Sequence, residues 1–224
     1  MAHVSRAAVA EGIGSFVIVF FTVGSIMSGG TLLEIALAYG LAAGVALSLS
    51  AHVSGGVCNP AIQVGLWVTG RCSSARSAVY LAAQVAGAVL AALALRWIEP
   101  FLFAQVDGGT PAVAPTLTLG KATVLEAFTT AFVVWAYFAS VLDDRGAFSK
   151  IAGLAVGFAV TLGVLASERL TGAAMNPARW FGPALVSGRW GDWWVFVLGP
   201  LAGGVVAAVG YWWLFLRGRA PATP

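Results

Sequence analysis

Six long apolar stretches constrain this sequence more than any other feature. They lie at about residues 8–27, 35–51, 78–98, 122–142, 150–166 and 194–216. Each has the roughly 17 to 25 residues that a helix needs to cross a hydrocarbon core about 30 Å thick. Only 9% of the 224 residues are charged, whereas about a quarter is usual in a soluble domain. The sequence therefore predicts an all-α membrane protein with six transmembrane helices.

The charged residues indicate how the chain crosses the membrane. A cleaved signal peptide is the alternative for the first stretch, but Glu11 interrupts it and no small-residue cleavage site follows Met27. Because Lys and Arg collect on the cytoplasmic side, we expect both termini in the cytoplasm. That places seven basic residues inside (Arg6, Arg71, Arg76, Arg145, Lys150, Arg217, Arg219) and four outside (Arg96, Lys121, Arg169, Arg189). The net charge of +3 is too small and too scattered to favour nucleic-acid binding.

The two halves of the sequence align with each other. Glu11 matches Glu126, and Asn59-Pro60-Ala61 matches Asn176-Pro177-Ala178, at an offset near 115 to 118 residues. Each half has three spans, so the second half enters the membrane in the opposite direction, as in inverted-repeat transporters. We expect one channel domain over residues 1–224, with a first repeat at about 7–98, a linker at about 99–121 and a second repeat at about 122–217.

The repeated Asn-Pro pair predicts the start of a helix. Asn caps the first turn well, and Pro is favoured directly after the cap. From Asn59 the apolar run lasts only to about Val68, and ten residues span only about 15 Å, half of a bilayer. Irregular backbone at membrane depth is tolerated only where it is buried in protein or lines a water-filled cavity. We therefore expect two re-entrant half-helices whose N-termini meet in a pore.

Several groups are expected to line this pore. Each capping Asn keeps its amide hydrogens free for the lumen, and the two helix N-termini repel cations, including protonated water. Arg179, in the first turn of the second half-helix, opposes the helix dipole, so we favour a pore role over snorkelling. The backbone carbonyls before each Asn are expected to form a ladder of acceptors: Gly55, Gly56, Val57, Gly172, Ala173 and Ala174.

The remaining polar side chains are expected to support the loops. Glu11 and Glu126 are candidates for a proton relay, but a role as acceptors for re-entrant N–H groups is favoured. We expect His52 to fix the first loop by a hydrogen bond. His52 and Ser54 also suggest an intramembrane hydrolase, but no third orienting group or nucleophile elbow accompanies them. The sequence thus predicts no catalytic residue and no enzyme.

The cysteine and histidine pattern predicts neither a metal site nor a cofactor, since two Cys and two His show no ligand spacing. Cys58 and Cys72 would lie about 20 Å apart if the intervening segment is helical, too far for a disulfide. Cys58 is favoured as a small buried filler over a ligand for soft metal or arsenite. An aromatic belt is expected where the last span meets the membrane surfaces, from Trp193, Trp194, Trp212 and Trp213.

The sequence resembles the aquaporin, or major intrinsic protein, family along nearly its whole length. The resemblance is carried by "AEGIGSFVIVF", "SGGVCNPAIQVG", "LDDRGAFSKIAGLAVGF" and "MNPARWFGPAL". It implies the aquaporin fold, a pore in each subunit and a homotetramer. Counting from the two Asn, it also implies a selectivity filter of Tyr39, Val164, Ala173 and Arg179.

Val164 stands where water-selective members of the family usually have His. The resemblance therefore implies a wider, less polar filter and is strongest to the nodulin-like branch and its bacterial relatives. We expect a passive channel in a bacterial cell membrane for water and small uncharged solutes, such as glycerol and arsenous or boric acid. The alternatives are a water-dominant pore and a structural or adhesive tetramer with a closed pore, which the lack of a long tail or partner motif disfavours.

Overall fold

Six helices of the structure are long and apolar enough to cross a membrane, which confirms the predicted number. The structure, a computed structural model, describes residues 2–218, so Arg219 lies outside the described residues. The six helices are α1 (Ala2–Met27), α2 (Leu32–Ser54), α4 (Ser74–Ile98), α6 (Leu119–Tyr137), α7 (Ala152–Thr171) and α9 (Trp193–Tyr211).

The helices extend beyond the apolar stretches from which they were predicted. α2, for example, begins three residues earlier because Thr31 and Glu34 form a reciprocal cap, in which the Glu34 carboxylate accepts a hydrogen bond from the Thr31 N–H at 2.6 Å. Hydropathy alone misses such polar first turns. Short segments prolong three spans: the π-helices η2 (Phe138–Leu142) and η4 (Trp212–Leu216), and the 3₁₀ turn η3 (Ser149–Ile151).

Two short helices begin at the repeated Asn-Pro pair. They are α3 (Pro60–Val68), with 9 residues, and α8 (Pro177–Ser187), with 11 residues. At 1.5 Å per residue, neither can cross a bilayer, so the predicted half-helices are confirmed. The expected linker also contains structure, since α5 (Pro100–Gln105) and the turn η1 (Asp107–Gly109) lie within it.

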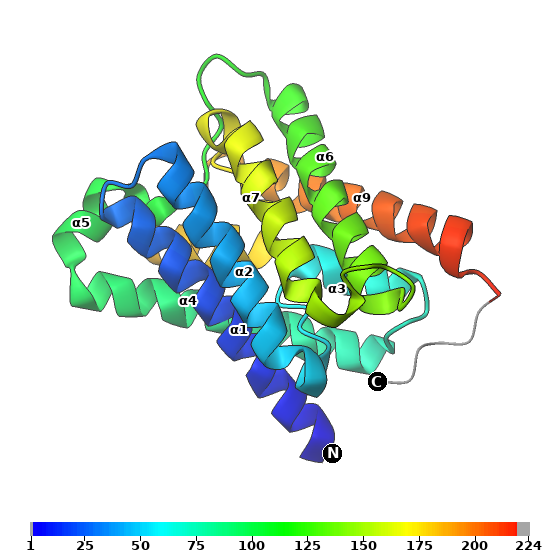
Figure 1. Cartoon of the computed structure of the whole chain (residues 1–224). Coiled ribbons are helices and arrows are strands. Elements are labelled where there is room, and N and C mark those ends of the chain that lie inside the picture. The colour runs from blue at the N-terminus through cyan, green and yellow to red at the C-terminus, as the bar shows by residue number, and fades with distance from the viewer. Residues whose placement is uncertain (1, 219–224) are drawn as a thin grey trace.

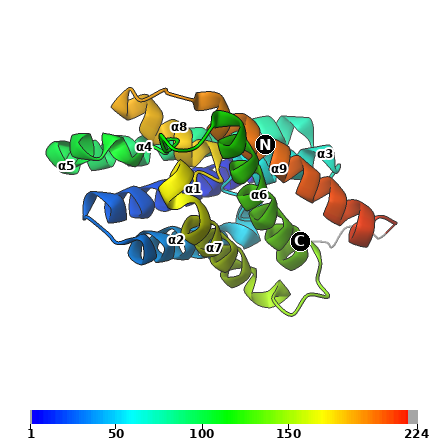
Figure 2. The ribbon, with the colours of Figure 1, turned by 90° about the horizontal axis from the view of Figure 1, so that it is seen from above.

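Three helix pairs form the wall of the bundle: α1 with α4, α6 with α9, and α2 with α7. Figures 1 and 2 show α2 and α7 side by side along much of their length. Glycines allow the close approach. A Cβ atom on Gly40 would lie 1.8 Å from the Thr161 Oγ1 of α7, and one on Gly203 of α9 would lie 1.9 Å from the Ala127 carbonyl oxygen of α6. Small residues at such crossings are typical of membrane helices.

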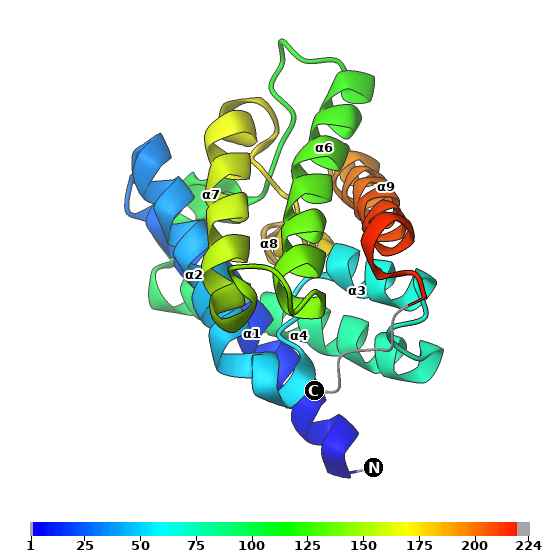
Figure 3. The same cartoon turned by 45° about the vertical axis from the view of Figure 1, so that its right-hand side comes forward.

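The half-helices are enclosed by the longer helices. α3 packs mainly against α9 and α4, and α8 packs mainly against α4. In Figure 3, α8 is seen between α7 and α6, and α3 lies below α9. Large apolar side chains such as Leu41, Leu90 and Phe128 are instead more than half exposed on the outer surface, as expected where a bundle contacts lipid. The fold thus buries the two Asn-Pro segments at its centre.

Candidate functional site: the central pore

The two Asn side chains cap the half-helices as their sequence predicts. Asn59 Oδ1 accepts a hydrogen bond from the Ala61 N–H at 2.8 Å, and Asn176 Oδ1 accepts one from the Ala178 N–H at 3.0 Å. Both Asn have extended backbone angles, and a proline follows each in the first turn. The cap is therefore local and alike in the two halves, although Asn176 Oδ1 also accepts from the Arg179 N–H at 3.3 Å.

The amide groups of the two Asn do not stay free, which corrects the expectation from sequence. Asn59 Nδ2 donates to the Met175 carbonyl at 3.0 Å, and Asn176 Nδ2 donates to the Cys58 carbonyl at 3.0 Å. Each Asn thus uses one amide hydrogen to join the opposite half, and at most one remains for a solute. The backbone at Cys58 and Met175 makes these bonds possible. Both residues have left-handed backbone angles, with φ values of 47° and 48°, and the carbonyl of each accepts a hydrogen bond from the Asn of the opposite half.

Such left-handed angles are unfavourable for residues other than glycine, and a buried carboxylate holds them in the first segment. Glu11, on α1, is fully buried. One of its oxygens accepts from the Val57 N–H at 3.0 Å and the Ser54 hydroxyl at 2.6 Å. The other accepts from the Cys58 N–H at 2.6 Å and Gln84 Nε2 at 2.7 Å.

Glu126 of α6, also fully buried, does the same for the second segment. It accepts from the Ala174 N–H at 3.0 Å, the Met175 N–H at 2.9 Å and the Thr171 hydroxyl at 2.6 Å. Both carboxylates are therefore engaged by donors that fix the loops, and within residues 2–218 neither forms a salt bridge with a basic side chain. This geometry favours the supporting role over a proton relay.

Two carbonyls of the expected acceptor ladder are already occupied. The Tyr137 hydroxyl of α6 donates to the Gly55 carbonyl at 2.7 Å, and the Tyr39 hydroxyl of α2 donates to the Ala174 carbonyl at 2.7 Å. Sequence reasoning missed Tyr137 altogether, because its partner is 82 residues away in the chain. No local signal identifies such a pair.

The four expected filter residues are nearly inaccessible. Arg179 lies with its guanidinium carbon 5.8 Å from the centre of the Tyr39 ring, and its Nη1 donates to the Gly109 carbonyl in η1 at 2.8 Å. Val164 and Ala173 have no exposed surface. The wider opening expected from Val164 is thus absent in this structure, because a valine side chain that no water-sized molecule reaches leaves no aperture on that wall.

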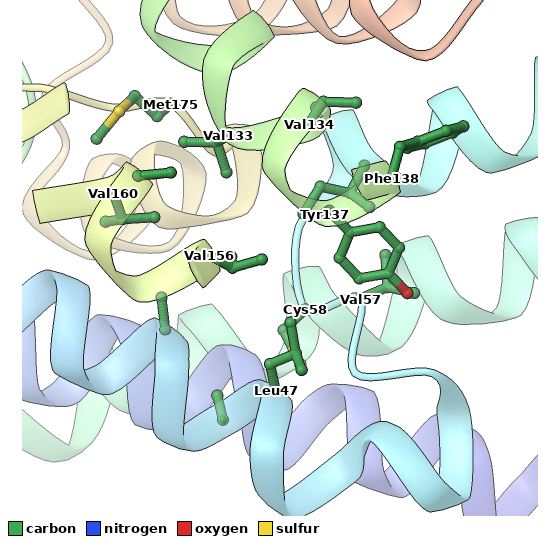
Figure 4. Close-up of a cluster of buried hydrophobic side chains, with 14 of the residues drawn as sticks. Leu47, Val57, Cys58, Val133, Val134, Tyr137, Phe138, Val156, Val160 and Met175 are labelled. Carbon is green, nitrogen blue, oxygen red and sulfur yellow. The ribbon is translucent and has the colours of Figure 1, made fainter. Parts of the chain in front are cut away.

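A narrow cavity lies next to the two Asn. It offers about 20 Å³ for the centres of water molecules, and one water needs about 10 to 15 Å³, so it holds about one. Figure 4 shows part of its apolar wall, with Leu47, Val133 and Val156 contributed by α2, α6 and α7. The cavity is lined by Ile18, Tyr39, Ala43, Leu47, Gly56, Val57, Cys58, Asn59, Ile62, Val133, Val156, Val160, Met175 and Asn176.

The loop role expected of His52 is wrong. Its side chain is exposed in the last turn of α2 and makes no hydrogen bond to any other described residue. His52 therefore does not fix the loop that Glu11 holds. The Ser54 hydroxyl donates to Glu11 instead, so Ser54 is not paired with His52 as a base.

The cysteines form no disulfide in the structure. Cys58 is buried, and its sulfur fills the space above Gly14, where an added Cβ atom would lie 2.1 Å from it. This packing favours the filler role. Among residues 2–218, no group of three or more His, Cys, Asp or Glu side chains could hold a metal ion. Trp193 and Trp213, at opposite ends of the last span, are about half exposed, and Trp194 and Trp212 are partly buried.

A polar cluster outside the membrane spans follows α6. The Asp143 carboxylate accepts hydrogen bonds from the Arg145 guanidinium and, at 3.0 Å, from the Tyr211 hydroxyl. Hydrogen bonding from Arg145 is the main cause that lowers the pKa of Asp143 to about 2. The same pairing raises the pKa of Arg145. This cluster fastens the loop between η2 and η3 to the end of α9.

Comparison with known proteins identifies the family of a chain that has two capped half-helices inside six spans. The pattern of the "Major intrinsic protein" family matches residues 1–211. The chain belongs to this family. It is therefore a membrane channel and not an enzyme.

Relatives support the same assignment over most of the chain. "Aquaporin TIP4-4" of Zea mays is 42% identical, over 94% of this chain and 87% of the relative. "Aquaporin-2" of Rattus norvegicus is 39% identical, over 92% of this chain and 78% of the relative. These plant and mammalian proteins give no support to the expected nodulin-like branch or to a bacterial source. The aquaglyceroporin from Plasmodium falciparum has the same fold, with a TM-score of 0.85 at 22% identity, over 96% of this chain and 97% of that one.

Proposed function

We propose that this chain is a passive channel for water and small uncharged solutes that excludes protons and other ions. The observation that carries this proposal is the pair of crossed hydrogen bonds at the centre, from Asn59 to Met175 and from Asn176 to Cys58. They hold two helix N-termini against one cavity, and the positive ends of both dipoles then disfavour a cation there. One amide hydrogen of each Asn is left to donate to the oxygen of a passing solute.

The remaining pore residues are assigned on the same basis. Asn59, Pro60, Ala61, Asn176, Pro177 and Ala178 build the centre, and Tyr39, Val164, Ala173 and Arg179 form the outer filter. The carbonyls of Gly55, Gly56, Val57, Gly172 and Ala174 are assigned to the acceptor ladder along the path, in which those of Gly55 and Ala174 already accept from Tyr137 and Tyr39. Glu11 and Glu126 are positioning residues, because they act on the pore only through the backbone they hold.

Glycerol and metalloid hydroxides such as arsenous or boric acid are the larger solutes that we assign to this channel. The outer filter combines the apolar side chain of Val164 with the guanidinium of Arg179. This combination suits a solute with carbon or metalloid on one side and hydroxyls on the other, once side chains move to open the path. The cavity near the Asn pair continues this division, with Val133, Val156 and Val160 on its apolar side.

A water-dominant pore is the second candidate, and one observation favours it. Val164 and Ala173 have no exposed surface, and the cavity holds about one water. A solute wider than water passes such a filter only if side chains move.

We propose that the channel is a homotetramer in the membrane, with both termini in the cytoplasm. Two inverted repeats, at about 7–98 and 122–217, fit the matching roles of Glu11 and Glu126 and of the two Asn. The loop arginines Arg71 and Arg145 then lie on the cytoplasmic side, as the distribution of positive charge favours.

Stopped-flow light scattering of proteoliposomes tests the proposal. Vesicles are shrunk with an impermeant osmolyte, and re-swelling is followed in glycerol and in arsenous acid. Fast shrinkage with fast re-swelling supports the solute channel, whereas fast shrinkage alone supports the water-dominant pore. Rates equal to those of protein-free vesicles would overturn both.

A matched pair of variants ties the flux to the cavity. Val156→Trp fills the cavity, while Val206→Trp adds the same side chain to a position that is 71% exposed on α9. We expect Val156→Trp to abolish the flux and Val206→Trp to keep it. Equal flux through both would show that the path lies elsewhere.

A further inference from the structure

The hydroxyl of Tyr39 forms a contact that the general architecture does not require. Tyr39 lies on α2, and its hydroxyl donates at 2.7 Å to the carbonyl of Ala174, in the segment between α7 and α8. Tyr39 lines the cavity, whereas Val164 and Ala173 do not and have no exposed surface. The cavity therefore reaches the side chain that makes this hydrogen bond but does not reach Val164 or Ala173.

The backbone next to Tyr39 lies close against α7. A Cβ atom on the next residue, Gly40, would lie 2.6 Å from the Gly157 carbonyl oxygen, and one on Gly44 would lie 2.7 Å from the Gly153 carbonyl oxygen. α2 is thus packed closely against α7 in the turn that follows Tyr39. Rotation about the side-chain bonds of Tyr39 moves the ring without disturbing this packing, and it breaks the hydrogen bond to Ala174.

The acceptor is equally fixed. Ala174 donates its own N–H to Glu126 at 3.0 Å, and its neighbour Met175 is held by the same carboxylate and by Asn59. The Ala174 carbonyl therefore stays in place when the phenol leaves, and a carbonyl without a donor at membrane depth is costly. A solute that carries a hydroxyl can satisfy it.

We propose that the Tyr39 hydroxyl determines passage through the outer constriction: it closes the path while it donates to the Ala174 carbonyl, and a permeating molecule must replace it as the donor. This inference rests on the proposed channel function and names the group that limits its flux. It selects small neutral molecules with an O–H or N–H donor, because only these compensate the carbonyl. Water and glycerol both qualify.

Tyr137 offers a matched control for this hydrogen bond. Its hydroxyl also donates to a backbone carbonyl of a re-entrant segment, that of Gly55, at the same distance of 2.7 Å. It does not line the cavity, and Figure 4 shows its hydroxyl beside Val57, away from Met175. Loss of the Tyr137 hydroxyl removes an equivalent bond without opening the outer constriction.

The test compares wild type, Tyr39→Phe, Tyr39→Leu and Tyr137→Phe as full-length protein in proteoliposomes, at equal incorporated amounts. We expect Tyr39→Phe to raise water and glycerol permeability together by about fivefold, the factor that one neutral hydrogen bond of about 1 kcal/mol represents. Tyr137→Phe should leave both permeabilities within about twofold of wild type. Tyr39→Leu, which removes the ring as well, serves as the variant of reduced bulk.

The other outcomes distinguish an effect of the Tyr39 hydroxyl from an effect of side-chain bulk and from failure of the proposed channel function. If Tyr39→Phe matches wild type while Tyr39→Leu conducts faster, bulk alone limits passage and the inference is overturned. A gain for glycerol without a gain for water overturns it too, since every permeating molecule must displace the phenol. If wild type does not exceed protein-free vesicles, the proposed channel function falls and this inference falls with it. If wild type conducts and Tyr39→Phe is no faster, the inference alone is overturned.

Discussion

The two re-entrant segments use the same local construction but are held and equipped differently. In each, a buried glutamate fixes a residue with positive φ, and the next residue, Asn, caps a half-helix. Glu11 receives four donors, one of them from Gln84 on α4, whereas Glu126 receives three. The first segment is therefore tied to one more helix than the second.

The second segment, unlike the first, is followed by a buried, positively charged side chain. Three residues after Asn176 stands Arg179, which is buried and anchored to the Gly109 carbonyl. Three residues after Asn59 stands Ile62. The comparison shows that repeat symmetry extends to the backbone and its supports, whereas the buried positive charge three residues after the capping Asn is present in the second repeat only.

The largest predicted effect tests the supports. Glu11→Gln and Glu126→Gln each place an amide NH₂ against donors that need an acceptor, so both should destabilise the fold by on the order of 3 to 5 kcal/mol. Glu11→Gln should be the more severe, because it disturbs four donors instead of three. The measurement is the thermal unfolding midpoint of the purified protein in detergent.

Glu34→Gln is the matched control for these two variants. Glu34 caps α2 on the exposed side, where Gln serves almost as well. Its unfolding midpoint should stay near that of wild type. If Glu126→Gln lowers the unfolding midpoint as much as Glu11→Gln or more, then the additional donor to Glu11 does not hold the first segment more firmly than the second.

The next effect tests the charge that only the second segment has. Arg179→Val should raise proton leakage by up to roughly a thousandfold, because a unit charge at about 4 Å contributes about 4 kcal/mol at an effective dielectric constant of 20. A pH-sensitive dye inside proteoliposomes, with an imposed proton gradient, measures the leak. Ile62→Val changes the equivalent position without a change in charge, and its leak should equal that of wild type. Equal leaks in the two variants would show that Arg179 does not exclude protons.

A smaller effect is expected at the outer constriction. Val164→His adds bulk and a polar group to a side chain with no exposed surface, so it should lower glycerol permeability several-fold while water still passes. Val164→Leu adds bulk alone and is the matched variant. If water and glycerol fall equally in Val164→His, then Val164 does not set the size limit. The same stopped-flow assay reports both permeabilities.

The sequence predicts those features that depend on residues close together in the chain. The six spans follow from the length of apolar runs, and the half-helices follow from Asn-Pro and the short run to Val68. The crossed bonds do not follow, because nothing in the sequence marks Cys58 or Met175 for positive φ. Local reasoning also assigned His52 to a loop that it does not contact.

The aperture of the filter could not be predicted for a related reason. Counting from the Asn residues gives the identity of Tyr39 and Val164, and their sizes suggest a wide opening. The actual opening depends on where the Tyr39 side chain points, and its partner Ala174 is 135 residues away. In this protein the side-chain conformation of Tyr39 therefore limits the width of the filter more than the identities of the filter residues do.

The smallest predicted effect concerns a carboxylate outside the membrane. Asp143 has a pKa lowered to about 2 by Arg145, so its stabilising effect is fully present above the unfolded value near 3.9 and is lost as pH falls toward 2. Asp143→Asn should lower the unfolding free energy at pH 7 by less than about 1 kcal/mol, because Arg145 is half exposed. Asp144→Asn, at the exposed neighbouring position, should have no effect. An Asp143→Asn loss as large as that of Glu11→Gln would show that carboxylates hold loops equally well at the surface and at membrane depth.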